Sequence, residues 1–278
     1  MKEKISAALG FFDGVHMAHK QVLSQAANVC PRSIAVIINR PGGKKLITQA
    51  LKYEAIRSLG ISDIAEFSFE EIRYLSCKDF IQKILAGKLN VTTAVCGYNF
   101  HFGHSGIGDS STLEMLGSSS GIETIVTPPV IFDSTFVSST RVRELLSEGN
   151  TSLANTLLTR PFGYDFKVIN GVQLAGKHGF PTINQEFPDE FFIPEFGVYA
   201  SETVINKKVC PSITNIGIRP TFEASKPLSE THVFDYSGDL YGQNVHVMLK
   251  KFIRAERKFS GVEELKKQVE KDMKNARI

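Results

Sequence analysis

Short apolar runs alternate with helical patterns along the first half of the chain. Residues 5–9 form a mostly apolar run typical of a buried strand, and residues 17–28 have the amphipathic period of a helix. Further strands are predicted at residues 33–38, 63–67, 91–96 and 122–126, and helices at residues 47–59 and 76–86, which stop before Gly60 and Gly87. This βαβ rhythm predicts an α/β fold, a doubly wound parallel sheet with helices on both faces.

The pattern changes near residues 157–161, where the helical period ends and short strands follow. These strands are predicted at residues 166–170, 198–205, 208–215, 231–236 and 244–252, with turn signals such as Asn170-Gly171 between them. Consecutive short strands predict an antiparallel β-barrel. A closing amphipathic helix follows, with Ser260 and Glu263 in a capping-box pattern and Val262, Leu265 and Val269 on one face. We therefore predict two domains, residues 1–158 and 159–278.

Composition excludes several classes of protein. The 278 residues carry a net charge of +3 that is spread over both halves, without the concentrated basic field that nucleic-acid binding needs. The chain has no apolar run long enough for a membrane span, and its start lacks the apolar stretch of a secretory signal. The four cysteines are scattered without a CxxC pair, which fits a reducing cytoplasm. We expect a cytoplasmic protein that binds neither nucleic acid nor a membrane.

The first candidate site follows the first predicted strand. Gly10, Asp13 and Gly14 allow a tight turn, and His16 and His19 project from the same face of the next helix's first turn. The N–H groups and positive dipole at such a helix start favour phosphate, and two imidazoles suit a charge-rich transition state. A lone histidine at a helix start is more often a cap or a surface residue, and that alternative stays open here.

Two further stretches should converge on the same edge of the sheet, where ligands bind beyond the carboxyl ends of the strands. Asn99 lies in a glycine-rich loop after the fourth predicted strand. Ser138, Ser139, Arg141 and Arg143 stand at the start of another helical run. Hydroxyls there are ordinary N-caps, but the arginine forks also match phosphate oxygens.

The second half has candidate oxygen ligands of its own. Thr182 and Asn184 are two residues apart, so on a strand they face the same side. Their hydroxyl and amide oxygens are of the type that Mg²⁺ prefers beside nucleotide phosphates. The alternative is a plain edge strand, with Pro181 excluding a neighbouring strand.

Several motifs resemble those of the bifunctional bacterial riboflavin kinase/FAD synthetase family, in the family's order. GFFDGVHMAH (residues 10–19) resembles the first nucleotide motif, residues 96–103 resemble G-x-(D/N)-F-x-F-G, and SSTRVRELLSEG (residues 138–149) resembles the second nucleotide motif. GFPTIN (residues 179–184) resembles the GFPTAN motif of riboflavin kinases, and residues 230–235 resemble the segment with the catalytic glutamate. The resemblance covers nearly the whole chain and implies a transferase that makes FMN from riboflavin and FAD from FMN, with ATP and Mg²⁺.

The resemblance also assigns roles to residues. It implies that His16, His19 and Glu230 are catalytic, that Gly10, Phe11, Asp13, Gly14, Asn99, Ser138, Ser139, Arg141 and Arg143 bind the first nucleotide, that Gly179, Pro181, Thr182 and Asn184 bind the second, and that Thr182 and Asn184 hold Mg²⁺. In this reading Glu230 takes the proton of the riboflavin hydroxyl, and the histidines stabilise the transition state of adenylyl transfer.

The chain departs from the family pattern at four places. Ala18 replaces a glycine of the first motif, Arg40 stands where the family has a histidine before Pro41, Thr159 replaces a glycine, and residues 175–179 alter a Gly-Arg element. These departures keep open a paralogue that has one activity or only binds flavin. A nucleotidylyltransferase acting on another substrate would fit the first half but has no need of the GFPTIN module.

Overall fold

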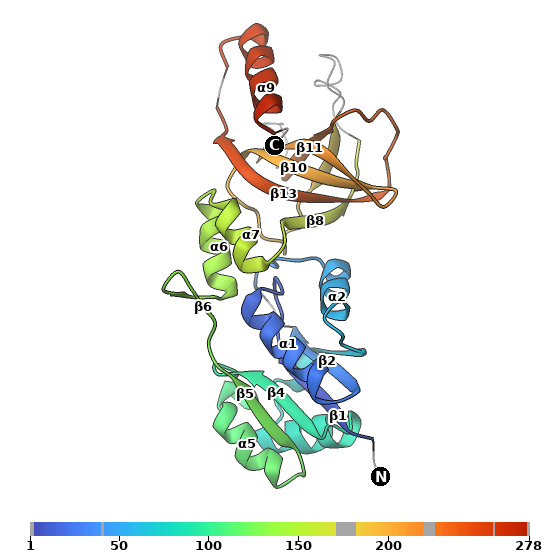
Figure 1. The fold of residues 1–278 in the computed structure, drawn as a ribbon, viewed down its shortest axis with the longest axis vertical. Helices are drawn as coiled ribbons and strands as arrows, with labels where there is room; N and C mark the ends of the chain where they lie inside the picture. The colour runs from blue at the N-terminus through green and yellow to red at the C-terminus, as the bar shows by residue number, and fades with distance from the viewer. Residues whose placement is uncertain (1–2, 40–41, 171–181, 219–225, 258, 277–278) are drawn as a thin grey trace. The chain divides into compact units, whose positions relative to one another are not determined.

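The fold comes from a computed structural model, which describes residues 3–39, 42–170, 182–218, 226–257 and 259–276 (Figure 1). The chain forms two compact units: Met1–Gly43 with Gln49–Ser139, and Lys44–Thr48 with Thr140–Ile278. The expectations for Arg40, residues 175–179 and Pro181 lie outside the described residues.

The first unit is built on a five-stranded parallel sheet in the order β3-β2-β1-β4-β5. Its strands are β1 (Ile5–Gly10), β2 (Arg32–Asn39), β3 (Asp63–Ser68), β4 (Thr93–Gly97) and β5 (Glu123–Thr127). Each overlaps a strand expected from the apolar runs, because a parallel sheet buries both faces of its strands. The predicted doubly wound parallel sheet is therefore confirmed.

Helices cover both faces of this sheet. They are α1 (Met17–Val29), α2 (Gln49–Arg57), α3 (Phe69–Ile72), α4 (Cys77–Asp79), the π-helix η1 (Phe80–Lys88), the 3₁₀ turn η2 (His104–Gly106) and α5 (Ser110–Ser118). Leu9 packs in a core cluster with Phe80 of η1 and Leu113 of α5. On the other face the Ser6 hydroxyl donates to the carbonyl of Ala26 in α1 (2.6 Å). A small hairpin, β6 (Ile131–Phe132) and β7 (Thr135–Phe136), precedes the second unit.

Two helix ends differ from the sequence prediction. Gly87 does not stop its helix, because η1 continues to Lys88 and the Leu89 N–H bonds five residues back to Ile84 (3.0 Å). The helix expected at residues 47–59 begins at Gln49, since Ile47 is buried within Lys44–Thr48, a segment of the second unit. There the Lys45 N–H donates to the carbonyl of Glu190 (2.7 Å).

The second unit is a nearly closed antiparallel barrel with helices α6 (Ser139–Ser147) and α7 (Thr151–Leu158) before it and α9 (Val262–Ala276) after it. Its six strands run in the order β8-β13-β10-β11-β12-β9. They are β8 (Phe162–Lys167), β9 (Ile183–Glu186), β10 (Gly197–Ile205), β11 (Lys208–Ile218), β12 (Pro227–Val233) and β13 (Asn244–Ala255). The Ile169 N–H donates to the carbonyl of Asn184 (2.8 Å), which brings the two outer strands together. The predicted barrel with a closing helix is confirmed.

Some boundaries differ here too. The strand expected at residues 166–170 begins earlier, at Phe162, and the strand expected at residues 231–236 is β12, which begins at Pro227. Ser260 bonds the carboxylate of Glu264 through its N–H (2.9 Å) and hydroxyl (2.8 Å), so Glu264 takes the role expected of Glu263. None of the described helices is long and apolar enough to cross a membrane.

Buried hydroxyls tie the central strands of the barrel to one another. Ser201 bonds the hydroxyl of Thr214 (2.8 Å), and Thr214 bonds that of Thr231 (2.8 Å). Satisfied polar groups of this kind fix strand register, because a slip by one residue would bury unpaired hydroxyls. The ladder therefore holds β12 in place against β11.

The helix α7 is fastened to the barrel by one side chain. The Asn155 amide nitrogen donates to the carbonyls of Leu249 (2.8 Å) and Lys250 (3.2 Å), and its oxygen accepts from the Phe162 N–H (2.7 Å). By packing, residues 140–158 thus group with the second unit. The boundary between residues 158 and 159 stays a prediction about the division of function.

We expect Asn155→Ala to lower the free energy of unfolding of the second unit by about 1–3 kcal/mol, because it leaves backbone groups of two strands without their partner. Urea unfolding followed by circular dichroism measures the effect. The exposed Ser152 on the same helix supplies the control, Ser152→Ala. Equal stability of the two variants would show that the amide bonds do not hold α7 to the barrel.

Candidate active sites

The turn after β1 is held in an unusual backbone conformation. Phe12 has φ of 49°, Gly14 of 83° and Val15 of 45°. A positive φ is rare for a β-branched residue and is kept only where the surroundings enforce it. Val15 is fully buried, and its N–H donates to the carbonyl of Phe12 (3.3 Å). The strained turn fixes the start of α1 at the carboxyl end of β1, where Gly10, Asp13 and Gly14 were expected to allow a tight turn.

His16 and His19 lie together, as their spacing predicted. Their rings stack with centroids 3.6 Å apart and planes 15° from parallel. His16 caps α1, since its Nδ1 accepts from the His19 N–H (3.4 Å). The ring of Phe12 meets His19 edge-on at 5.5 Å. A capping role for His16 therefore does not exclude a role in a binding site. His16 caps the helix, and its ring also stacks on the imidazole of His19.

The electrostatics around His19 favour its neutral form. Burial, the neighbouring His16 and the ammonium of Lys52 together hold the pKa of His19 well below its ordinary value. Its Nδ1 is buried, with no hydrogen-bond partner among the described residues. Buried polar atoms in native proteins are normally paired, and exceptions concentrate at functional positions. At neutral pH this imidazole is therefore uncharged.

The stretch around residue 139 reaches the first turn, as the sequence predicted. The Ser139 hydroxyl donates to the carbonyl of Asp13 (2.8 Å). Asn99 lies exposed just after β4, in a turn closed by the Phe100 N–H on the carbonyl of Gly97 (3.0 Å). The segments after the neighbouring strands β1 and β4 thus lie at the carboxyl edge of the sheet, and Ser139 contacts the first of them.

The two predicted phosphate arginines belong to the second unit. Arg143 donates from Nε (3.2 Å) and Nη2 (2.6 Å) to the carbonyl of Lys44, and Arg141 pairs with Glu144 one helical turn away (3.1 Å). Arg143 therefore anchors the segment Lys44–Thr48. Their role in binding the nucleotide stays a prediction.

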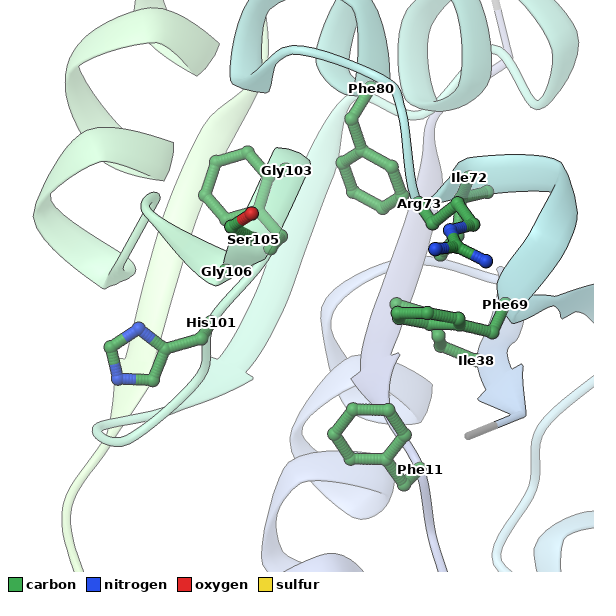
Figure 2. Close-up of a pocket in the computed structure, with 11 residues that line it drawn as sticks. Phe11, Ile38, Phe69, Ile72, Arg73, Phe80, His101, Gly103, Ser105 and Gly106 are labelled. Carbon is green, nitrogen blue, oxygen red and sulfur yellow. The ribbon is translucent and has the colours of Figure 1, made fainter. Parts of the chain in front are cut away.

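A cavity of about 350 Å³ opens in the first unit beyond β1 and β2 (Figure 2). Its lining is mainly aromatic and apolar: Phe11, Ile38, Phe69, Ile72, Phe80 and Phe102, with Arg73, His101, Gly103, Ser105 and Gly106. The guanidinium of Arg73 lies 5.6 Å from the centre of the Phe69 ring and forms an ion pair with Glu70 (2.9 Å). Phe11 was expected to contact nucleotide, whereas the lining contributed by Phe69, Arg73 and Phe80 was not foreseen.

The second site forms on three strands of the barrel. In the strand register Glu230 stands opposite Asn184 of β9 on one side and opposite Asn215 of β11 on the other. Residues directly opposite in antiparallel strands place their side chains on the same face. A carboxylate thus lies between two amides, and the half-buried Asn215 is the member of this row that the sequence did not single out.

The glycine-rich approach to this site is described only in part. Thr182 immediately precedes β9, and the Asn184 amide nitrogen donates to its carbonyl (3.4 Å). Asn184 is 6% exposed. Gly179 and Pro181 lie outside the described residues. Thr182 lies just outside the strand, so the expectation that its side chain faces the same side as that of Asn184 stays a prediction.

Comparison with known proteins matches each half separately and the chain as a whole. A family model described as FAD synthetase matches residues 1–141, and one described as riboflavin kinase matches residues 158–278. A bifunctional riboflavin kinase/FMN adenylyltransferase of Bacillus subtilis (strain 168) is 34% identical, over 97% of this chain and 90% of its own length. The protein of that name from Escherichia coli (strain K12) is 31% identical, over 97% and 90%.

A solved structure has the same fold. A crystal structure described as a macrolide-efflux protein from Streptococcus pneumoniae covers 99% of this chain and 94% of its own, with a TM-score of 0.89 and 24% identity. At that level of identity the likeness concerns the fold alone.

Proposed function

The chain belongs to the bifunctional riboflavin kinase/FMN adenylyltransferase family, and we propose how its residues divide the two reactions. It is a transferase of flavin biosynthesis: the C-terminal half phosphorylates riboflavin to FMN, and the N-terminal half adenylylates FMN to FAD. ATP is the second substrate of both steps. The observation that carries this conclusion is the presence of both family domains in one chain that matches bifunctional relatives over nearly its full length.

In the kinase half, Glu230 is the general base. Its carboxylate takes the proton of riboflavin's terminal ribityl hydroxyl while that oxygen attacks the γ-phosphorus of ATP. The row formed with Asn184 and Asn215 supports this role, because amides on either side orient a carboxylate without neutralising it. The buried bond between Thr231 and Thr214 keeps the strand that carries Glu230 in register.

Mg²⁺ would be held by oxygens beside that carboxylate. Thr182 and Asn184 supply a hydroxyl and an amide oxygen, which are hard donors of the kind this cation prefers. Their adjacency, with Glu230 directly across from Asn184, fits such an ion. When bound, Mg²⁺ would offset the negative charge that develops on the phosphates.

In the adenylyltransferase half, an oxygen of the FMN phosphate attacks the α-phosphorus of ATP, and pyrophosphate leaves with the electrons of the broken P–O bond. His16 and His19 stabilise the charge of this transition state, and the N–H groups at the start of α1 bind phosphate oxygens. The buried Nδ1 of His19 supports this role. Asn99, Ser138, Ser139, Arg141 and Arg143 remain proposed nucleotide contacts, and both halves keep small molecules as their substrates.

The aromatic cavity takes the flavin ring in this step. A flat apolar heterocycle gains most from aromatic walls, through buried area and stacking. Phe11 lines the cavity and directly follows β1, so the cavity lies beside the turn that precedes His16. We place the protein in the cytoplasm, in keeping with its four free cysteines.

Phe69→Ala should raise the KM for FMN in FAD synthesis about tenfold, because one wall of the cavity is lost. The KM for ATP and the rate of riboflavin phosphorylation should not change. Steady-state kinetics with FMN varied at saturating ATP measures the effect. Tyr74→Ala is the matched control, since Tyr74 is 72% exposed and lies outside the lining. An unchanged KM for FMN in Phe69→Ala would show that the flavin ring does not bind in this cavity.

One assay tests the function as a whole. Purified protein is mixed with riboflavin, ATP and Mg²⁺, and the flavins are separated by chromatography over time. FMN should appear first and FAD after it. If FMN forms without FAD, the protein is a kinase whose adenylyltransferase site is inactive. If flavin binds but no product forms, the protein is a regulatory flavin-binding protein.

A further inference from the structure

A second carboxylate lies against the sheet face that carries Glu230. Glu256 directly follows β13, and a Cβ built on Gly217 of β11 would overlap its Oε1 and lie 2.6 Å from its Cδ. The three nearest atoms that this Cβ would meet all belong to the carboxyl group of Glu256. Gly217 therefore makes the space that the carboxylate occupies. Glu256 itself is exposed, so a ligand from solvent can reach it.

The strand register places this carboxylate on the same face as the row of Glu230, Asn184 and Asn215. Residues two apart on a strand point to the same face, so the carboxylate over Gly217 shares the face of Asn215. Asn215 stands opposite Glu230, and antiparallel partners also share a face. Since two residues of a strand span about 7 Å, the carboxylate of Glu256 lies one strand over from Glu230 and one same-face position along.

The direction of phosphoryl transfer decides on which side of Glu230 riboflavin lies. The proposed Mg²⁺ site, and with it the phosphates of ATP, is beside Thr182 and Asn184, on the β9 side of Glu230. Attacking and leaving oxygens lie roughly in line in this reaction, so the attacking hydroxyl approaches from the opposite side. The ribityl chain behind that hydroxyl then lies over β11. An extended ribityl chain reaches about as far as two residues of a strand, which brings its secondary hydroxyls to Glu256.

We propose that the carboxylate of Glu256 accepts hydrogen bonds from the secondary ribityl hydroxyls of riboflavin and holds the chain over β11. The inference rests on the proposed role of Glu230 as the base of the kinase reaction. Hydrogen bonds to a carboxylate are roughly twice as strong as those between neutral groups. Glu256 takes no proton in the reaction. The proton of the terminal hydroxyl passes to Glu230, its oxygen bonds the γ-phosphorus, and ADP leaves with the electrons of the broken P–O bond.

Glu256→Ala should raise the KM for riboflavin in FMN formation about 10–100-fold with little change in kcat, the usual effect of losing hydrogen bonds to a charged group that binds the substrate. A flavin with a hydroxypentyl chain keeps the terminal hydroxyl and lacks the secondary ones, so its KM should be the same in Glu256→Ala and wild type. Glu263→Ala is the matched control, since Glu263 is an exposed carboxylate of the same unit. The proposal is overturned if Glu256→Ala has the riboflavin KM of this control, or if it loses equally with both flavins.

Gly217→Ala tests the geometry and leaves the carboxylate itself in the chain. Its methyl group would take the place of Oε1 and push the flexible side chain of Glu256 aside, so the KM for riboflavin should rise as in Glu256→Ala. Alanine suits the backbone there, because Gly217 does not have a positive φ. The double variant should be no worse than Glu256→Ala, since both changes remove the same contact. Additive losses would contradict the proposal.

A binding measurement separates this proposal from the role of Glu230. Riboflavin titrated in the presence of ADP and Mg²⁺, followed by its fluorescence, should bind Glu256→Ala about tenfold more weakly than Glu263→Ala. Both variants leave the first unit unchanged, so the difference reports on the second. If Glu230→Gln phosphorylates riboflavin normally, the base is another group, and the titration still decides whether Glu256 binds the ribityl chain. Equal affinities of the two variants would overturn the proposal.

Discussion

Glu230→Gln should reduce the rate of riboflavin phosphorylation by about 10²–10⁴-fold, the usual effect of removing a general base. Glutamine has nearly the same size, so the row with Asn184 and Asn215 keeps its shape while the proton acceptor is lost. The loss should appear in kcat, because the substrates still bind. FAD synthesis from added FMN should continue at the wild-type rate, since that reaction uses the other half of the chain.

Two controls separate a lost base from a damaged barrel. Glu186→Gln changes an exposed carboxylate two residues beyond Asn184 on the same strand and should phosphorylate riboflavin normally. Thermal unfolding of Glu230→Gln should match wild type, because the buried hydroxyl bonds of Thr231 and Thr214 are untouched. Riboflavin phosphorylation within a few-fold of wild type would move the base to another group.

Sequence periodicity predicted the sheets of both units because buried strands have recognisable runs of apolar residues. β2 and β10 are nearly continuous in burial, and each was placed within one residue. Errors arose where tertiary packing decides. Gly87 stays inside its helix because η1 is wound with bonds to the fifth residue back. Ile47 fits a helical pattern, yet it is buried in Lys44–Thr48, a segment of the second unit.

The candidate sites divide in the same way. His16 and His19 are three residues apart at the start of one helix, so their spacing alone predicted that they lie on the same face. The stacking of their rings was not predicted. Asn215 joins Glu230 only through the register of two strands. The sequence assigned Asn215 no role, because strand register cannot be read from a local pattern.

His19→Ala should lower the rate of FAD formation by about 10²–10³-fold, the usual effect of losing one preorganised donor to a charged transition state. Riboflavin phosphorylation should stay at the wild-type rate. The expected loss lies mainly in kcat, because the N–H groups at the start of α1 still bind ground-state phosphate. His104→Ala is the control, since His104 is exposed in the same unit. FAD formation at the rate of that control would leave His16 with its capping role and His19 with a structural one.

The pH dependence of stability gives a second test of the same residue. A histidine whose pKa is lowered in the folded state takes up its proton first in the unfolded chain, so its contribution to stability is full above its ordinary pKa of 6.5 and is lost as the pH falls below it. Wild type should therefore lose stability below pH 6.5 faster than His19→Ala. Urea unfolding of the first unit at several pH values measures the difference. Parallel curves would mean that His19 titrates normally, and the neutral imidazole would then no longer explain its part in adenylyl transfer.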